Sequence, residues 1–250
     1  MKFNVFLPQE ATTQKVPAIY FLSGLTCTED KFVEKSGAMA EASKHGLALI
    51  VPDTSPRGVS IEGDNDSWDF GTGAGFYLDA TAPKWAKHYR MYSYIVKELP
   101  RLIQQLPIDN TRVSIMGHSM GGHGALTIFL KNPTQFKTAS AFAPIAHPIA
   151  CPWGQKAFSN YLGEDKEAWK EYDTVELLKR FQDKVDILVD IGTADGFLEK
   201  ELLIDQLKQT VEELGQDQFK IRYQEGYDHT YFFLSTFVAD HIQHHAKYLK

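Results

Sequence analysis

Short runs of β-branched, aromatic and other apolar residues alternate along the chain with longer stretches whose apolar positions recur at helical spacing. The short runs predict strands at residues 3–7, 18–22, 47–52, 112–117, 140–144, 186–192 and 220–225. Apolar residues at positions i, i+3 and i+4 predict helices at residues 31–45, 92–106, 121–132, 198–214 and 231–249. Because strands that alternate with helices usually form a mostly parallel sheet with crossover helices, we predict an α/β fold.

Two segments interrupt this alternation. Residues 54–83 have little periodicity and many Gly, Asp and Ser residues, so we expect a long excursion over the strand ends. Its aromatic residues favour an ordered wall: Trp68, Phe70, Phe76 and Tyr77. Residues 145–181 are expected to form a second excursion of the same type, and Pro100 is expected to distort the helix at 92–106. Because no internal repeat and no Pro- or Ser-rich linker divides the chain, we expect a single domain over residues 1–250.

Composition and charge exclude several classes of protein. Hydrophobic residues make up 43% of the chain and charged residues 23%, which is typical of globular proteins. A net charge of −6 and a pI near 5.8, without a basic stripe, argue against nucleic acid as the main partner. Cys27 and Cys151 are too few for a disulfide framework, which fits a reducing compartment. The N-terminal stretch lacks a signal-peptide core and no apolar run could cross a bilayer, so we expect a soluble cytoplasmic protein with no membrane partner.

The stretch "GHSMGGHGAL" contains the pattern G-x-S-x-G at Gly117–Gly121, directly after a predicted strand and before a predicted helix. This is the setting of a nucleophile elbow, in which a serine is exposed on a sharp turn and its neighbours must be small. The helix that follows offers backbone N–H donors to a developing oxyanion. The alternative is that the glycines serve only the packing of strand against helix. Ser119 is the predicted nucleophile.

A serine nucleophile needs a histidine base and an acid that orients it, in the chain order Ser, acid, His. His229 is the predicted base, because it follows the strand at 220–225 and lies in a loop beyond its carboxyl end. The other downstream histidines fall within the C-terminal helix and are expected to be solvated or capping groups: His241, His244 and His245. Their H-x-x-H-H spacing lacks a supporting Cys or carboxylate, so we expect no metal site.

Asp195 is the predicted acid, because it lies in the loop directly after the strand at 186–192. Asp190, inside that strand, is the reserve, since strand ends are uncertain by a few residues. Asp228 adjoins the predicted base and is expected to cap the following helix.

Two backbone N–H groups are expected to form the oxyanion hole. One is that of Met120, the residue after the nucleophile. The other is that of Leu25, after the Ser23-Gly24 turn that follows the strand at 18–22; the alternative is an ordinary turn in which Thr28 caps the next helix. "GTGAGF" at 71–76 has Phe76 where a dinucleotide loop needs its third glycine, so we expect no dinucleotide site.

Across nearly its whole length the chain resembles the S-formylglutathione hydrolase family, also called esterase D. The stretches that carry the resemblance are "YFLSGLTCTED", "VPDTSPRG", "SWDFGTGAGFYLDAT", "HYRMYSY", "GHSMGGHGAL", "SAFAPI", "CPWGQKAFSNYLG", "EGYDHTYFF" and "DHIQHHAKYL". The resemblance implies an α/β-hydrolase fold, with Ser119, Asp195 and His229 as the triad and Leu25 and Met120 as oxyanion donors. It implies hydrolysis of S-formylglutathione to glutathione and formate in formaldehyde detoxification, with side activity on small esters. It further implies a cytoplasmic homodimer that needs no cofactor.

The sequence departs from the family in two places. Family members usually carry a further N-terminal segment, so residues 3–7 are expected to form an unpaired edge strand and the chain to be folded but less stable. The family commonly has a polar residue where this chain has Ile191, and we expect this to affect the rate rather than the type of reaction. Cys27, two residues after the oxyanion turn, and Trp153 are expected neighbours of the substrate, although each is equally consistent with a buried core position. An acyltransferase of the same fold and a catalytically silent binding protein remain alternatives.

Overall fold

One sheet of seven strands forms the centre of the protein, whose computed structural model describes all 250 residues. The strand order is β1-β3-β2-β4-β5-β6-β7; β1 runs antiparallel to β3, and all other neighbours are parallel. The strands are Phe3–Phe6 (β1), Val16–Leu22 (β2), Ala48–Pro52 (β3), Ile108–His118 (β4), Phe136–Phe142 (β5), Ile187–Gly192 (β6) and Phe219–Gln224 (β7). The predicted mostly parallel sheet is confirmed, and β1 lies at its edge as expected.

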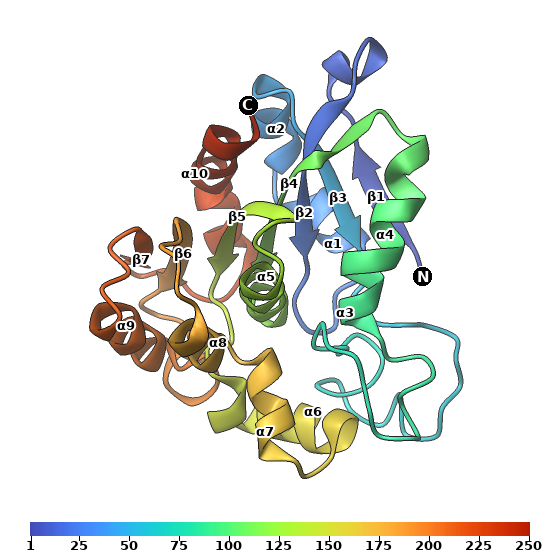
Figure 1. Cartoon of the computed structure of the whole chain (residues 1–250), viewed down its shortest axis with the longest axis vertical. Coiled ribbons are helices and arrows are strands. Elements are labelled where there is room, and N and C mark those ends of the chain that lie inside the picture. Colours follow the sequence, from blue (N-terminus) through green and yellow to red (C-terminus); the bar gives the residue numbers. More distant parts are fainter.

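Helices flank the sheet on both faces (Figure 1). They are Asp30–Lys35 (α1), Ala38–Lys44 (α2), Met91–Ser93 (α3), Leu99–Leu102 (α4), Met120–Lys131 (α5), Pro152–Leu162 (α6), Lys166–Trp169 (α7), Thr174–Arg180 (α8), Ile204–Glu213 (α9) and Tyr231–Leu249 (α10). α5 packs on β4 and β5 together with α8, whereas α10 packs on the central strands together with α2. None of these helices has both the length and the apolar character that a membrane span requires.

Two helices predicted as continuous are each divided. The helix at 31–45 separates into α1 and α2 at Gly37, whose φ of 69° ends one helix before the next begins. The helix at 198–214 begins as a wide turn at Leu198–Leu202 and restarts as α9 after Leu203, whose φ is 51°. Buried residues occur on both sides of each break, so apolar periodicity alone did not reveal the breaks.

The predicted helix at 92–106 is distorted at Pro100, as expected. It consists of α3, a wide π turn at Tyr94–Glu98, α4 and a 3₁₀ turn at Ile103–Gln105. Pro100 lies in the first turn of α4, where its missing N–H is tolerated. The wide turn before it replaces the α-helical geometry in which the proline ring would clash with a carbonyl.

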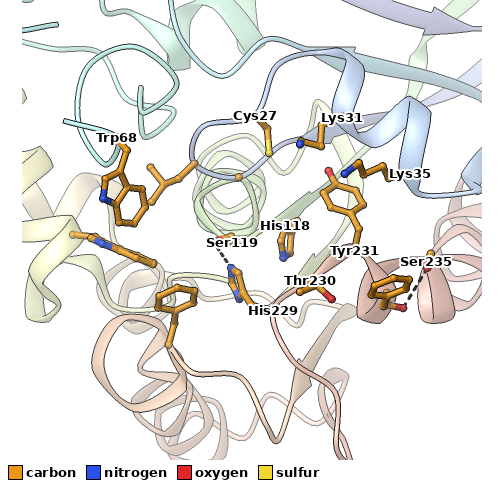
Figure 2. A pocket seen from close by; sticks show the side chains of 15 residues that line it. Cys27, Lys31, Lys35, Trp68, His118, Ser119, His229, Thr230, Tyr231 and Ser235 are labelled. Carbon is orange, nitrogen blue, oxygen red and sulfur yellow. Dashed lines mark hydrogen bonds between the residues drawn. The ribbon is translucent and has the colours of Figure 1, made fainter. Parts of the chain in front are cut away.

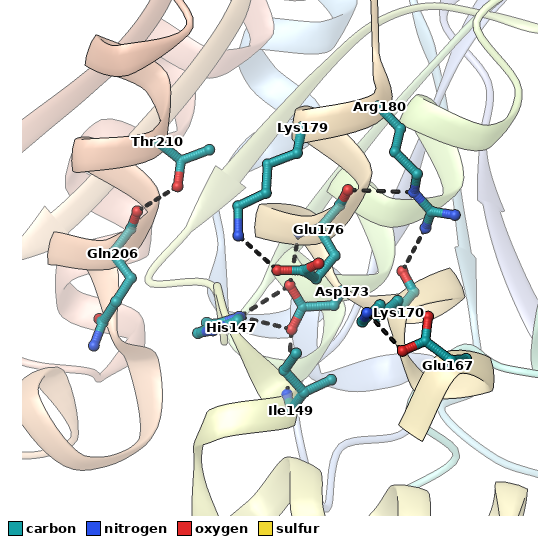
Figure 3. A network of polar contacts seen from close by, with 10 residues as sticks. All are labelled: His147, Ile149, Glu167, Lys170, Asp173, Glu176, Lys179, Arg180, Gln206 and Thr210. Atoms are coloured by element: carbon teal, nitrogen blue, oxygen red, sulfur yellow. Dashed lines mark hydrogen bonds and ion pairs between the residues drawn. The ribbon is translucent and has the colours of Figure 1, made fainter. Parts of the chain in front are cut away.

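The segment at 145–181 is not an irregular excursion: the expectation was wrong, and the segment folds as α6, α7 and α8. The buried side of α6 recurs at helical spacing: Trp153, Ala157, Phe158, Tyr161 and Leu162. Asp173 caps α8 by accepting the Glu176 N–H at 3.1 Å. The same carboxylate contacts His147 Nδ1 at 2.9 Å and accepts the Ile149 N–H at 3.2 Å (Figure 3). The contacts of the buried Asp173 carboxylate therefore join α8 to the loop that follows β5.

The segment at 54–83 is irregular, as predicted, and no helix or strand lies between β3 and α3. Phe76 and Tyr77 are fully buried, and the Tyr77 hydroxyl donates to the Ser23 carbonyl at 2.8 Å. His123 Nε2 on α5 donates to the Phe76 carbonyl at 3.0 Å. These contacts hold the segment against the carboxyl ends of the strands as an ordered wall, although Trp68 itself is 57% exposed.

The histidines of α10 are buried and not solvated, so that expectation was wrong. His241 Nε2 contacts Asp190 Oδ2 at 3.2 Å, and Ser140 Oγ lies 2.8 Å from both His241 Nδ1 and His245 Nε2. A neutral His241 that donates to Asp190 must accept the Ser140 hydroxyl proton, and Ser140 then accepts from His245. His244 donates to the Thr138 hydroxyl at 2.9 Å. Polar contacts thus attach one face of α10 to β5 and β6.

Candidate active site

Ser119 lies in a strained turn between β4 and α5. Its φ of 58° and ψ of −119° are a conformation that residues other than glycine rarely adopt. A Cβ atom at Gly117 would lie 2.0 Å from the Gly121 carbonyl oxygen, and one at Gly121 would lie 1.9 Å from the Leu22 carbonyl oxygen. The Ser119 N–H donates to the Phe142 carbonyl at 2.9 Å. The glycines therefore serve packing and the sharp turn at once, and the two interpretations of the motif coincide.

Ser119, His229 and Asp195 form one hydrogen-bonded chain, of which Figure 2 shows the contact between Ser119 and His229. His229 Nδ1 lies 2.6 Å from Asp195 Oδ2, and His229 Nε2 lies 2.9 Å from Ser119 Oγ. Because the carboxylate can only accept, His229 carries its proton on Nδ1 and leaves Nε2 free to accept the proton of the serine hydroxyl. The Asp195 side chain is fully buried, and its Oδ1 accepts the Phe197 N–H at 2.9 Å. This arrangement can deprotonate Ser119 when it attacks a carbonyl carbon.

The other acidic candidates have different partners. Asp190 faces away from the chain described above: its carboxylate accepts from Arg222 Nε and Nη2, both at 2.6 Å, as well as from His241. Burial would raise the pKa of Asp190, but hydrogen bonds from His241 and Arg222 outweigh it and hold this pKa below its ordinary value. Asp228 accepts from the Thr230 N–H and hydroxyl and so orders the turn before α10, where Thr230 is the capping residue. The expected cap by Asp228 is thus absent.

The two expected oxyanion donors belong to the two segments next to Ser119. Met120 is the first residue of α5, and Leu25 follows the Ser23-Gly24 turn after β2. Neither N–H donates to an acceptor of the protein. A Cβ atom at Gly24 would lie 3.1 Å from Ser119 Cβ, which shows how closely this turn approaches the serine. Leu25 lines the same cavity as Ser119, and the role of both N–H groups remains a prediction.

A cavity of about 700 Å³ opens over the serine and the histidine. Cys27 and Trp153 both line it, as expected, and both are also nearly buried, at 8% and 7% exposure. Burial raises the pKa of the Cys27 thiol, although neighbouring lysines oppose this. Trp153 packs against Phe197 and Trp68, with ring centroids 4.8 Å and 5.6 Å away. Both residues are thus nearly buried and also line the cavity, and their place beside a substrate remains a prediction.

Several residues of the cavity were not predicted from the sequence. Lys31 and Lys35 of α1 line it, as do Tyr231 and Phe232 at the start of α10. The spacing of four between the lysines was a visible signal, because residues at i and i+4 share one face of a helix. Phe232 is 83% exposed, and nothing in the helical pattern distinguished it from an ordinary surface position.

His118 and His123, beside the serine in sequence, have supporting positions. The His118 ring packs on His229 with centroids 4.7 Å apart, and neither of its nitrogens has a hydrogen-bond partner. Burial, with a smaller contribution from His229, holds the pKa of His118 well below its ordinary value. A neutral His118 therefore adds no positive charge beside the base. Ile191 is fully buried in β6, and its expected effect on rate remains a prediction.

Comparison with known proteins agrees with this geometry. A family model described as putative esterase matches residues 1–244. The chain is 54% identical to S-formylglutathione hydrolase of Rattus norvegicus and 51% identical to that of Arabidopsis thaliana, in each case over 100% of this chain and 89% of the relative. It is also similar to the solved structure of an S-formylglutathione hydrolase from Agrobacterium tumefaciens, with a TM-score of 0.95 and 45% identity over 99% of this chain and 90% of that one. A ferulic acid esterase at 18% identity and a TM-score of 0.72 shares the fold alone. The sheet and its helices have the α/β-hydrolase fold.

Proposed function

The chain belongs to the esterase family and, within it, to the S-formylglutathione hydrolases, and from this premise we propose that it hydrolyses S-formylglutathione to glutathione and formate. The observation that carries the proposal is the hydrogen-bonded chain Ser119–His229–Asp195 at the base of a cavity large enough for a tripeptide thioester. Ser119 is proposed as nucleophile, His229 as general base and acid, and Asp195 as the group that orients the imidazole.

In the first half-reaction, Ser119 Oγ attacks the formyl carbon while its proton passes to His229 Nε2. The carbonyl oxygen becomes an oxyanion, and the N–H groups of Leu25 and Met120 are proposed to stabilise it. The tetrahedral intermediate then collapses: the bond from carbon to sulfur breaks, and glutathione leaves with the proton from His229. A formyl ester of Ser119 remains.

In the second half-reaction, water attacks the formyl ester and gives a proton to His229 Nε2. Collapse of the second intermediate breaks the bond from carbon to Ser119 Oγ, which recovers its proton, and formate leaves. His229 becomes a positively charged imidazolium and loses its proton again in each half-reaction. The buried Asp195 carboxylate therefore stabilises the imidazolium in both. No step requires an oxidant, a metal or a cofactor.

Further parts of the proposal concern the protein as a whole. All seven strands belong to one sheet over one continuous core, which supports a single catalytic domain over residues 1–250. Cys27 and Cys151 are both free, which fits the proposed cytoplasmic location. The protein is further proposed to be a homodimer with side activity on small esters; light scattering coupled to size exclusion tests the former.

Steady-state kinetics test the activity. We expect kcat/KM for S-formylglutathione to exceed that for 4-nitrophenyl acetate by several orders of magnitude, with formate and glutathione released in equal amounts. Formation of a formyl ester in place of formate when methanol is added would instead indicate an acyltransferase. Absence of turnover of the thioester by a protein that still hydrolyses the aryl ester would contradict the proposed substrate.

Ser119→Ala tests the nucleophile. It removes Oγ and leaves His229 without its proton donor, so kcat should fall by about 10⁴-fold or more while the thermal unfolding transition is retained. Ser43→Ala, at an exposed position of α2, is the matched control and should keep full activity. Substantial turnover by Ser119→Ala would exclude the proposed covalent intermediate.

A further inference from the structure

Two lysines on one helix face the cavity. Lys31 and Lys35 lie four residues apart on α1, which places them on the same side of the helix. Both line the cavity that contains Ser119 and His229, and Figure 2 shows their side chains at the end opposite Trp68. Phe32, between them in sequence, is buried and stacks on Phe21 with ring centroids 3.5 Å apart, which fixes the helix to the sheet.

These lysines have no acidic partner. Neither is part of an ion pair, and none of the 15 residues that line the cavity is Asp or Glu. This is notable in a chain of net charge −6, because acidic residues outnumber basic ones over the molecule as a whole. Like charges at i and i+4 repel, so the pair destabilises the helix slightly unless an anion binds between them.

A third donor lies at the same end of the cavity. The Tyr231 and Ser23 hydroxyls are buried beside each other, and neither has a hydrogen-bond partner in the protein beyond the other. Figure 2 shows the Tyr231 hydroxyl on the side of the cavity where the two lysine side chains end. Two buried hydroxyls that have only each other leave one O–H group without an acceptor, which is costly, and a ligand oxygen at this place would accept from it.

The opposite end of the cavity has another character. Trp68, Trp153 and Phe197 form an aromatic wall there, without a cationic side chain among them. The cavity is therefore divided at Ser119 into a cationic end and an aromatic end. A substrate whose reacting carbonyl lies at Ser119 and which carries a carboxylate is held better when that carboxylate points towards α1.

We propose that Lys31 and Lys35, assisted by the Tyr231 hydroxyl, form a carboxylate-binding subsite for the thiol part of the substrate. The inference rests on the proposed function, because glutathione supplies such a group: its thiol part carries two carboxylates and one ammonium group. The subsite makes the enzyme selective for anionic thioesters over neutral esters of the same acyl group. It also places positive charge on the side from which the thiolate departs.

The test uses inhibition rather than turnover of the thioester. S-methylglutathione, which has no acyl group on sulfur to be hydrolysed, is measured as a competitive inhibitor of 4-nitrophenyl acetate hydrolysis, beside its diamide, in which both carboxyl groups are neutral. We expect Lys31→Gln and Lys35→Gln each to raise the inhibition constant of S-methylglutathione about tenfold, the effect of one charge-assisted hydrogen bond. The inhibition constant of the diamide should change less than twofold.

Lys87→Gln is the matched control: it alters the net charge equally at an exposed position that does not line the cavity. Lys31→Arg and Lys35→Arg should restore most of the affinity. Unchanged inhibition constants in both Gln variants, or equal inhibition by S-methylglutathione and its diamide, would overturn the subsite. Failure of the proposed function is a separate result, namely no turnover of S-formylglutathione by the unaltered protein, and the inhibition readout does not depend on it.

Discussion

Asp190 and Asp195 are five residues apart, and the structure predicts opposite consequences when each is changed to Asn. In Asp195→Asn, the Asn carbonyl can still accept the Phe197 N–H, so its NH₂ group turns towards His229 Nδ1. His229 must then accept at Nδ1 and carry its proton on Nε2, where it can no longer take the proton of Ser119. A wrong tautomer of this kind costs about 10⁴-fold in kcat, or about 5 kcal/mol of barrier.

Asp190→Asn is expected to lower the free energy of unfolding rather than the activity. Both carboxylate oxygens accept from Arg222 at 2.6 Å, and Oδ2 also accepts from His241 at 3.2 Å, so an NH₂ group would face a donor. Losing one charge-assisted hydrogen bond and opposing a second donor costs about 3 to 5 kcal/mol in a fully buried pair. The Arg222 side chain is 36% exposed and water can replace part of the loss, so we expect about 2 to 3 kcal/mol. For a chain of this size that lowers Tm by roughly 5 to 10 °C.

The assay measures aryl ester hydrolysis at 25 °C together with thermal unfolding for both variants. Asp195→Asn should unfold within about 2 °C of the unaltered protein and be almost inactive. Asp190→Asn should unfold earlier and keep its kcat within about threefold. The opposite pattern, with Asp190→Asn inactive and Asp195→Asn unaffected, would show that the reserve candidate is the catalytic acid.

Two further predictions concern buried groups. Burial lowers the pKa of His244 from 6.5 to about 4. Below pH 6.5 the unfolded chain therefore binds a proton that the folded chain does not. This group should lower the free energy of unfolding, measured with urea, by about 2 kcal/mol between pH 7 and pH 5. The free energy of unfolding should depend less steeply on pH in His244→Gln, and as steeply as in the unaltered protein in the exposed control His88→Gln. Equal pH dependence in both variants would show that His244 is not the group responsible. Because burial raises the pKa of the Cys27 thiol and Cys27 lines the cavity, iodoacetamide should inactivate the enzyme slowly at pH 7 and faster at pH 9. Cys27→Ser should resist, and equal loss of its activity would place the reactive group elsewhere.

The sequence could predict the sheet and the positions of Ser119, Asp195 and His229 because one geometric rule governs both. Each of the three follows a strand of a parallel sheet, and the carboxyl ends of such strands meet at one edge. Residues that directly follow different strands of this sheet are therefore brought close together in space. The strained turn at Ser119 was also predictable, since only small neighbours permit it.

The remaining features depend on contacts between distant segments. The break at Leu203 has no glycine or proline to mark it, and its positive φ is maintained by surrounding packing. Helical periodicity cannot distinguish His241 from a solvated histidine, because its partners Ser140 and Asp190 lie on strands about 50 to 100 positions earlier. The cationic end of the cavity was missed for the same reason: Lys31 and Ser119 come to line one cavity only through the fold.

The polar contacts between α10 and the sheet also determine how far along its own axis the helix can lie. An apolar helix can slide by one turn on an apolar sheet and still bury its side chains, whereas donors and acceptors must meet one by one. His245, Ser140, His241 and Asp190 alternate donor and acceptor in a single order, so only one register of α10 satisfies all of them. Because α10 begins two residues after His229, this register also determines the position of His229 relative to Ser119. The histidines of the C-terminal helix thus take no part in the proposed reaction, but their contacts with the sheet fix the position of His229, the histidine that does.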